Sequence, residues 1–213
     1  MVDCLPLGPL GTNCYLVRAS EGAAEAVVVD PSGTVAEITG ALTACGARCV
    51  AILVTHGHFD HVLGVADLVR ATGAPVYMAR GECFLLEEPR EVWGVTVEAQ
   101  AVDVRLADEG GERLDLAGVS FETVAVPGHS PTHLAFAVEG ALLSGDVLFQ
   151  GSVGRTDLPG ADWATLLASI RTLVGRFSAD TTVHPGHGPS TTLGVEFATN
   201  PFLAELRGEQ ARA

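Results

Sequence analysis

Lysine is absent from this chain: all 12 basic residues among its 213 residues are arginines. Chemistry that depends on a lysine amine, such as a Schiff base or an ammonium group that clamps a substrate, is therefore excluded. Acidic residues outnumber basic ones by 26 to 12, and the formal net charge is −14. Because this charge repels nucleic acids and anionic membrane surfaces, neither is expected as a partner.

The chain also lacks the patterns of export, membrane insertion and disulfide frameworks. No basic segment followed by an unbroken apolar run opens it, and no apolar stretch reaches transmembrane length. Its five cysteines are odd in number, scattered and without a Cys-x-x-Cys pair, which is typical of a reducing compartment. We therefore expect a cytoplasmic protein in which the cysteines act as small apolar side chains.

No boundary between domains is visible in the sequence. Neither a tract rich in proline, glycine or serine nor a block of like charges divides the chain, and its length suffices for one substantial core. Its 47% of hydrophobic residues and its 25 glycines are ordinary for a loop-rich α/β protein. We expect residues 1–213 to form a single domain.

Strand, helix and turn patterns alternate along the chain. Strands are predicted for short apolar, β-branched runs that end at turn residues, and helices for stretches with apolar residues three or four positions apart. The expected strands are 14–17, 26–29, 49–55, 75–78, 114–116, 119–126, 134–138, 141–143 and 181–183. The expected helices are 35–45, 61–71 and one that begins after Asp162, while 82–100 has no clear pattern. This alternation predicts a layered α/β sandwich.

Three histidines and an aspartate fall within six consecutive positions, in the run Thr55-His56-Gly57-His58-Phe59-Asp60-His61. Imidazole nitrogens and carboxylate oxygens are ligands for zinc, iron and manganese, and a cluster without cysteine differs from a closed structural zinc site. The run therefore predicts a catalytic metal site. A polar loop with exposed histidines would account for one or two of these residues but not for all of them.

Four predicted strands are each followed within a few residues by a histidine or an aspartate: His56, His129, Asp146 and His187. Strand ends on one edge of a sheet bring loops from distant parts of the chain to one point. His56 and His58 alternate in an extended loop, so both can face one metal. Asp60 and His61 lie at the start of the next helix, displaced toward a second metal. Asp146 is the candidate ligand that both metals share, and two metals about 3.5 to 4 Å apart would bridge a water and lower its pKa.

This series of ligands resembles that of the metallo-β-lactamase-fold hydrolases, which are αββα sandwiches with metals at the sheet edge. The resemblance implies two divalent ions, with zinc expected and iron or manganese as alternatives. It implies the first metal on His56, His58, His129 and Asp146. It implies the second metal on Asp60, His61, Asp146 and His187. The two aspartates, Asp60 and Asp146, are the candidate catalytic residues.

Three further segments resemble the glyoxalase II-like branch, in its short bacterial, hydroxyacylglutathione hydrolase-like form: 151–160, 184–189 and 200–203. The implied reaction is hydrolysis of a thioester, such as an S-(2-hydroxyacyl) thiol, by a metal-bound hydroxide. Because a thiolate leaves readily, this reaction requires no strong general acid. The longer glyoxalase II enzymes hold the glutathione carboxylates with a C-terminal helical region that contains lysines. Only a short tail without lysine follows His187 here, which argues against glutathione as the thiol.

Four residues outside the predicted ligand set have alternative roles. Arg155 either meets a substrate carboxylate or pairs with Asp157. His184 is a further ligand, a residue that supports a ligand, or a packed histidine. Asp30 either supports a ligating histidine or only forms a turn, and His133 is either structural or lies at the rim of the site.

Three other functions fit parts of the pattern. A persulfide dioxygenase resembles glyoxalase II but uses one iron, held by the equivalents of His56, His129 and Asp146, and oxygen consumption would distinguish it from a hydrolase. β-Lactam hydrolysis is disfavoured because secreted enzymes of that kind carry an export signal. A non-enzymatic module that only binds metal is also disfavoured, because it would not require an arrangement of seven ligands.

Overall fold

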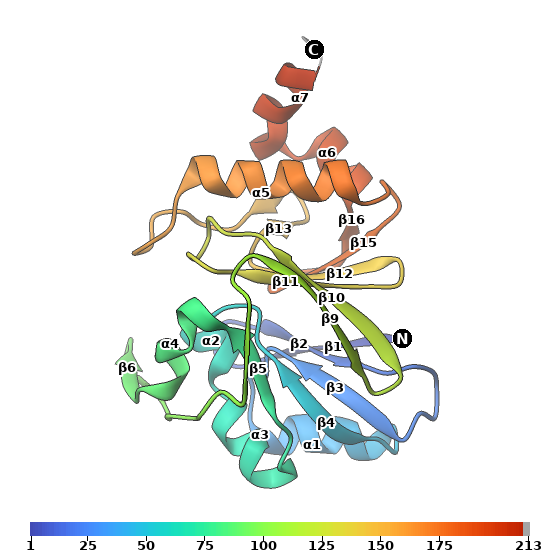
Figure 1. Cartoon of the computed structure of the whole chain (residues 1–213), viewed down its shortest axis with the longest axis vertical. Coiled ribbons are helices and arrows are strands. Elements are labelled where there is room, and N and C mark those ends of the chain that lie inside the picture. The colour runs from blue at the N-terminus through green and yellow to red at the C-terminus, as the bar shows by residue number, and fades with distance from the viewer. Residues whose placement is uncertain (211–213) are drawn as a thin grey trace.

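Two six-stranded β-sheets lie face to face, and helices cover the outer face of each sheet (Figure 1). The structure is a computed structural model that describes residues 1–210, so residues 211–213 of the expected domain lie outside the described part. The order of layers is helix, sheet, sheet, helix. This is the αββα sandwich that the sequence predicts.

The N-terminal half of the chain forms the first sheet, with strand order β1-β2-β3-β4-β5-β8. The first three strands are antiparallel neighbours, and the remaining pairs are parallel. The strands are β1 (Val2–Leu7), β2 (Thr12–Val17), β3 (Glu25–Val29), β4 (Arg48–Leu53), β5 (Val76–Ala79) and β8 (Val104–Leu106). Helices α1 (Val35–Ala44) and α3 (Val65–Thr72) cover its outer face (Figure 1).

The C-terminal half forms the second sheet, with strand order β16-β15-β12-β11-β10-β9. Its pairs are antiparallel except β12 with β15. The strands are β9 (Gly110–Leu116), β10 (Val119–Ala125), β11 (Leu134–Val138), β12 (Ala141–Gly145), β15 (Thr182–Pro185) and β16 (Thr191–Thr192). The helices on this side are α5 (Trp163–Arg176), α6 (Leu193–Thr199), η2 (Pro201–Leu203) and α7 (Ala204–Gln210). The side chain of Asp162 caps α5, as predicted.

Alternation of side chains along the strands builds three hydrophobic cores. In β3, Val28 packs with the residues of α1 and α3, whereas Val27 and Val29 face the second sheet. In β11, Phe136 faces the first sheet and Ala135 packs with the residues of α5. Strands of both sheets therefore bury both faces, which explains their continuous apolar runs.

The remaining short elements lie around one end of the sandwich. They are α2 (Phe59–Val62), η1 (Arg80–Glu82), α4 (Phe84–Glu87), the hairpin β6 (Arg90–Val92) and β7 (Val95–Val97), and the hairpin β13 (Leu148–Phe149) and β14 (Ser152–Val153). The stretch 82–100, which has no clear pattern in the sequence, thus forms α4 and the β6–β7 hairpin. Strand β1 was not predicted either.

The prediction of one helix over 61–71 is wrong, because α2 and α3 are separate helices with a break at Gly64. The backbone N–H of Gly64 donates to the carbonyl of Pro31 at 2.7 Å. A Cβ at Gly64 would lie 2.6 Å from the carbonyl oxygen of Gly33. The close approach of the loop after β3 therefore interrupts a helix that the apolar spacing alone would continue.

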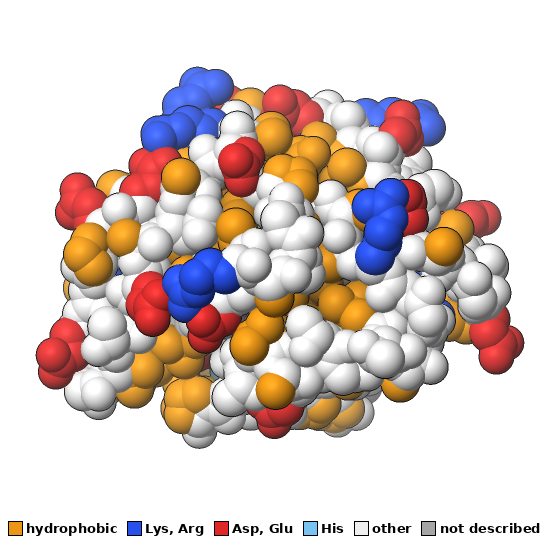
Figure 2. All heavy atoms as spheres, turned by 90° about the horizontal axis from the view of Figure 1, so that it is seen from below, with side chains coloured by type: hydrophobic (Ala, Val, Ile, Leu, Met, Phe, Trp, Pro, Cys, Tyr) orange, Lys and Arg blue, Asp and Glu red, His pale blue; other side chains and the backbone are white. Residues whose placement is uncertain are grey.

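Charged side chains are distributed in mixed groups on the face that Figure 2 draws. Arginine side chains there lie close to acidic ones, with hydrophobic side chains exposed between them. Exposed ion pairs such as Arg105 with Glu87 and Arg155 with Asp157 are of this kind. Within residues 1–210, no helix is both long enough and apolar enough to cross a membrane.

Candidate metal centre

The seven residues predicted as ligands meet where strands of both sheets end. His56 and His58 follow β4, Asp60 and His61 form the first turns of α2, His129 follows β10, Asp146 follows β12, and His187 follows β15. All but Asp60 and His61, which lie in the short helix α2, are within a few residues of the end of a strand, and the seven side chains converge as the sequence predicts. Their side chains form overlapping groups whose donor atoms lie within 4.8 Å of one another.

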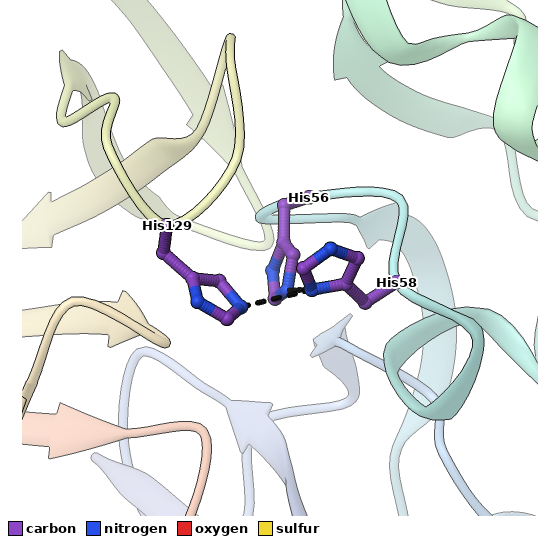
Figure 3. Close-up of side chains that lie close together, drawn as sticks. All are labelled: His56, His58 and His129. Carbon is purple, nitrogen blue, oxygen red and sulfur yellow. Dashed lines mark hydrogen bonds between the residues drawn. The ribbon is translucent and has the colours of Figure 1, made fainter. Parts of the chain in front are cut away.

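The first group consists of three imidazoles that point toward one another (Figure 3). His58 Nδ1 lies 3.0 Å from His56 Nε2 and 2.8 Å from His129 Nε2. Three ring nitrogens around one point form a donor set of the kind that binds a transition metal. The group brings together residues 71 positions apart in the chain.

The second group consists of Asp60, His61 and His187. Asp60 Oδ2 lies 3.2 Å from His187 Nε2 and 3.6 Å from His61 Nε2. This group has a carboxylate in place of one imidazole, so it also suits metals that prefer oxygen ligands.

Asp146 lies between the two groups. Its Oδ2 is 3.5 Å from His129 Nε2 and 3.5 Å from His187 Nε2, and its Oδ1 is 3.3 Å from His61 Nε2. Asp146 is therefore in reach of both groups, which is the position predicted for a shared ligand.

The imidazoles of the first group are held neutral. Burial lowers the pKa of His58 to about 4 and the pKa of His56 well below its usual value. Burial also lowers the pKa of His129, although Asp146 acts in the opposite direction. A neutral imidazole has the free lone pair that a metal requires.

The second group favours a positive charge. Burial lowers the pKa of His187, but hydrogen bonds to Asp146 and Asp60 outweigh it and raise this pKa to about 9. The pKa of His61 lies well above its usual value because Asp146 and Asp30 outweigh its burial. Burial raises the pKa of Asp60, yet the nearby His187 and His61 bring it down to about 2. Burial also raises the pKa of Asp146, but His61 and His187 outweigh it and hold this pKa well below its usual value, so both carboxylates of the centre are ionised.

Two buried atoms between these groups lack a hydrogen-bond partner: His61 Nε2 and Asp146 Oδ1. They lie 3.3 Å apart. Leaving a buried polar atom unsatisfied costs free energy, and unsatisfied atoms in a native structure point to an absent water or ion. A divalent cation at this position would satisfy both atoms, so the residues present fit a metal.

Asp30 holds two residues at the ligand groups, His61 and Thr55, through hydrogen bonds. Its Oδ2 accepts hydrogen bonds from His61 Nδ1 at 2.9 Å and from Thr55 Oγ1 at 2.7 Å, and its Oδ1 accepts from the backbone N–H of Thr55 at 2.8 Å. Thr55 Oγ1 in turn lies 3.0 Å from His56 Nδ1. Asp30 has a positive φ of 50°. Of its two alternative roles, the structure shows support of a histidine in the centre.

Three further residues brace the centre and were not singled out in the sequence. Thr12 Oγ1 donates to Asp60 Oδ2 at 2.7 Å, and Asn13 Nδ2 donates to the carbonyls of Pro185 and Gly188, on either side of His187. Glu82 accepts from the backbone N–H groups of Gly57 and Thr132. The only sequence signal was polarity within otherwise apolar segments, which is a weak indication.

The other residues with alternative roles are now placed. Arg155 pairs with Asp157 through two hydrogen bonds of 2.7 and 2.8 Å, and its contact with a substrate stays a prediction. His184 packs against Tyr15 and lies 2.9 Å from Ser190 Oγ, outside the ligand groups. His133 is buried and its Nε2 accepts from the backbone N–H of Asp146, which is a structural role.

A sequence model of the metallo-beta-lactamase superfamily matches residues 7–187, a range that includes every candidate ligand. The chain belongs to the metallo-beta-lactamase superfamily. Members of this superfamily are generally metal-binding hydrolases, and the fold described above is the one its solved structures have. This confirms the family and the general class of function predicted from the sequence.

Three members of the superfamily resemble the chain over almost its whole length. The structure of BLEG-1, a B3 metallo-beta-lactamase, is 37% identical with a TM-score of 0.88, over 96% of this chain and 100% of that one. The structure of TTHA1623 in a di-iron-bound form is 42% identical with a TM-score of 0.80, over 95% and 100%. The hydroxyacylglutathione hydrolase GloC of Haemophilus influenzae is 34% identical, over 95% of this chain and 97% of its own.

The candidate metal centre opens into a cavity of about 740 Å³. Five of the candidate ligands line its floor: His58, Asp60, His129, Asp146 and His187. Most of the remaining lining is apolar and comes from loops and short elements. A cavity of this size accommodates a small-molecule substrate beside the ligand groups.

Proposed function

We propose that this superfamily member is a metal-dependent hydrolase that cleaves a thioester, such as an S-(2-hydroxyacyl) thiol. The observation that carries the proposal is the convergence of a three-histidine group and a second group of one aspartate and two histidines, with Asp146 in reach of both. Five of these seven residues line an open cavity. The relationship to GloC, a hydroxyacylglutathione hydrolase, supports a thioester as the substrate.

Two divalent ions would fit these residues. His56, His58 and His129 would hold one ion, Asp60, His61 and His187 the other, and Asp146 would reach both. Bound there, the ions would supply Lewis acidity and lower the pKa of a water. Zinc suits both groups, and iron is supported as an alternative by the di-iron form of TTHA1623.

The other residues of the cavity favour a substrate with a good leaving group. Among the described residues that line it, Glu82 is the one carboxylate outside the ligand groups, and both its oxygens accept backbone N–H groups. It is therefore not free to protonate a leaving group. A thiolate, with a thiol pKa of about 8.5, leaves without such help, whereas an alkoxide or amide anion does not.

The centre can be tested by comparing two histidines that lie three positions apart. We expect His187→Ala to lower the metal content from two ions per chain to one and to slow thioester hydrolysis about 100-fold. His184→Ala is the control, because His184 lies outside the ligand groups. Elemental analysis and a thiol-detecting assay with a panel of acyl thioesters measure both quantities. Full activity of the His187 variant, or no activity of the parent protein on any thioester, would refute the proposal.

β-Lactam hydrolysis is a second candidate, favoured by the 37% identity and the TM-score of 0.88 to BLEG-1. Its leaving group is an amine nitrogen that requires a proton, and no free acid lines the described part of the cavity. We therefore expect kcat/KM for a chromogenic cephalosporin to be lower than for thioesters. The same protein sample in an oxygen electrode with a thiol persulfide tests the dioxygenase alternative.

A further inference from the structure

The walls of the cavity are apolar and come from segments far apart in the chain. Leu10 lies between β1 and β2, Phe84 lies in α4, Trp93 lies in the turn between β6 and β7, and Phe149 lies in β13. Leu158 lies in the loop before α5. Loops of both sheets thus contribute apolar side chains to one cavity above the ligand groups.

Three of these side chains are unusually exposed. Trp93 is 72% exposed, Phe84 56% and Leu10 49%, yet all three line the same cavity. The Trp93 ring also contacts the ring of Phe59, with centroids 5.4 Å apart. Scattered exposed apolar residues are normal, but their gathering around one cavity marks a surface that binds an apolar group.

The backbone at Trp93 supports this interpretation. Trp93 has a φ of 52° and Gly94 a φ of 77° in the two-residue turn of the hairpin. A positive φ is unfavourable for a bulky residue, and asparagine or aspartate would suit this position better. A strained backbone at a bulky residue that lines a cavity points to a function for its side chain.

Of the two arginines at the cavity, Arg155 is paired with an acid, whereas the buried Nε of Arg90 has no hydrogen-bond partner. Arg155 forms two hydrogen bonds with Asp157. Arg90 donates to the carbonyl of Gly57 and lies in the field of Glu82. The lining has two arginines, Arg90 and Arg155, against three carboxylates, Asp60, Glu82 and Asp146. Apart from the histidines, its side chains therefore offer no excess of positive charge to a substrate with several carboxylates.

From these observations we propose that the substrate carries a hydrocarbon chain or aromatic ring beside the thioester, and that this group lies against Phe84, Trp93 and Phe149. The proposal rests on the proposed function for the thioester itself. It assigns Trp93 and Phe84 to substrate specificity, and it excludes a substrate that is recognised mainly through carboxylates.

The first test varies chain length on each side of the thioester. With N-acetylcysteamine as the thiol, we expect kcat/KM to rise roughly threefold per methylene from acetyl toward octanoyl. The thioacetate of octanethiol shows whether a chain on the sulfur side has the same effect. We expect Trp93→Ala to lower kcat/KM for the longer chain about tenfold more than for acetyl, whereas Trp163→Ala, on α5, changes both equally. Equal kcat/KM for all chain lengths, or a higher value for acylglutathiones, would overturn the proposal.

The second test requires no turnover. In a Trp163→Phe variant, Trp93 is the only tryptophan, so its fluorescence reports on the cavity. We expect the thioether S-octyl-N-acetylcysteamine to shift its emission to shorter wavelength with saturation, and the S-ethyl compound to cause no shift at the same concentration. Binding of the octyl compound by a protein that cleaves no thioester would refute the proposed function and leave the apolar site standing. No binding by a protein that does cleave thioesters would refute the apolar site alone.

Discussion

Asp30 determines which nitrogen two histidines present to the candidate centre. A carboxylate only accepts hydrogen bonds when ionised, so His61 donates from Nδ1, and it is the Nε2 facing Asp146 that offers a lone pair once the imidazole is neutral. Thr55 donates its hydroxyl proton to Asp30 and can therefore accept from His56 Nδ1. His56 Nε2 is then also free for a metal. One carboxylate thus orients one imidazole directly and another through a hydroxyl.

Replacing Asp30 by asparagine tests this role at the level of one residue. Asparagine tolerates a positive φ as well as aspartate does, so the backbone stays as it is. The amide has lost the charge and one acceptor oxygen, and we expect metal affinity to fall about 10- to 100-fold. Competition with a chromophoric chelator measures the affinity, and Asp3→Asn, which alters an acid paired with Arg18, is the control. Equal affinities in the two variants would show that Asp30 does not position the ligands.

Among the secondary-structure elements, features that depend on neighbouring residues could be predicted from the sequence. Features that depend on contacts between distant parts of the chain could not. The ligands were predictable because four of them follow predicted strands within a few residues and the other three lie in the same short run as His56. The roles of Thr12 and Glu82 were not, since their partners Asp60 and Thr132 lie 48 and 50 positions away. The stretch 82–100 had no readable pattern because its elements are short and only partly buried, so neither helical nor alternating spacing develops.

The break between α2 and α3 gives a prediction at this scale. An alanine in a continuous helix would stabilise it by up to about 1 kcal/mol relative to glycine. At Gly64, however, the added Cβ would lie 2.6 and 2.7 Å from the backbone oxygens of Gly33 and Pro31. We expect Gly64→Ala to lower the free energy of unfolding by about 1 to 3 kcal/mol. Urea denaturation measures this free energy of unfolding.

The matched control for that substitution is Gly40→Ala. Gly40 lies inside α1, and a Cβ there meets nothing within 4 Å. We expect this change to raise the free energy of unfolding by about 0.5 to 1 kcal/mol. If both alanines stabilised the protein, the close contact at Gly64 would not be what separates α2 from α3.

At the scale of the whole molecule, the candidate centre joins the two halves of the sandwich. The first half supplies His56, His58, Asp60 and His61, and the second supplies His129, Asp146 and His187. The sheets also meet through an apolar core in which Phe121 and Phe136 are fully buried. That core does not need a metal, so we expect the fold to persist without one.

Metal removal should therefore lower stability without abolishing the fold. A ligand that binds only the folded state stabilises it by about 4 kcal/mol at a thousandfold excess over its dissociation constant. We expect the unfolding temperature to fall when a chelator strips the protein and to recover when zinc or iron is added back. Hydrogen exchange should become faster in residues 55–61 and 184–188 and should stay unchanged in the strands of the inter-sheet core. Asp146→Asn is the decisive comparison, because Asp146 reaches both ligand groups: its unfolding temperature should respond much less to added metal. An unfolding temperature that is the same with chelator and with metal would show that these seven side chains do not form a metal centre.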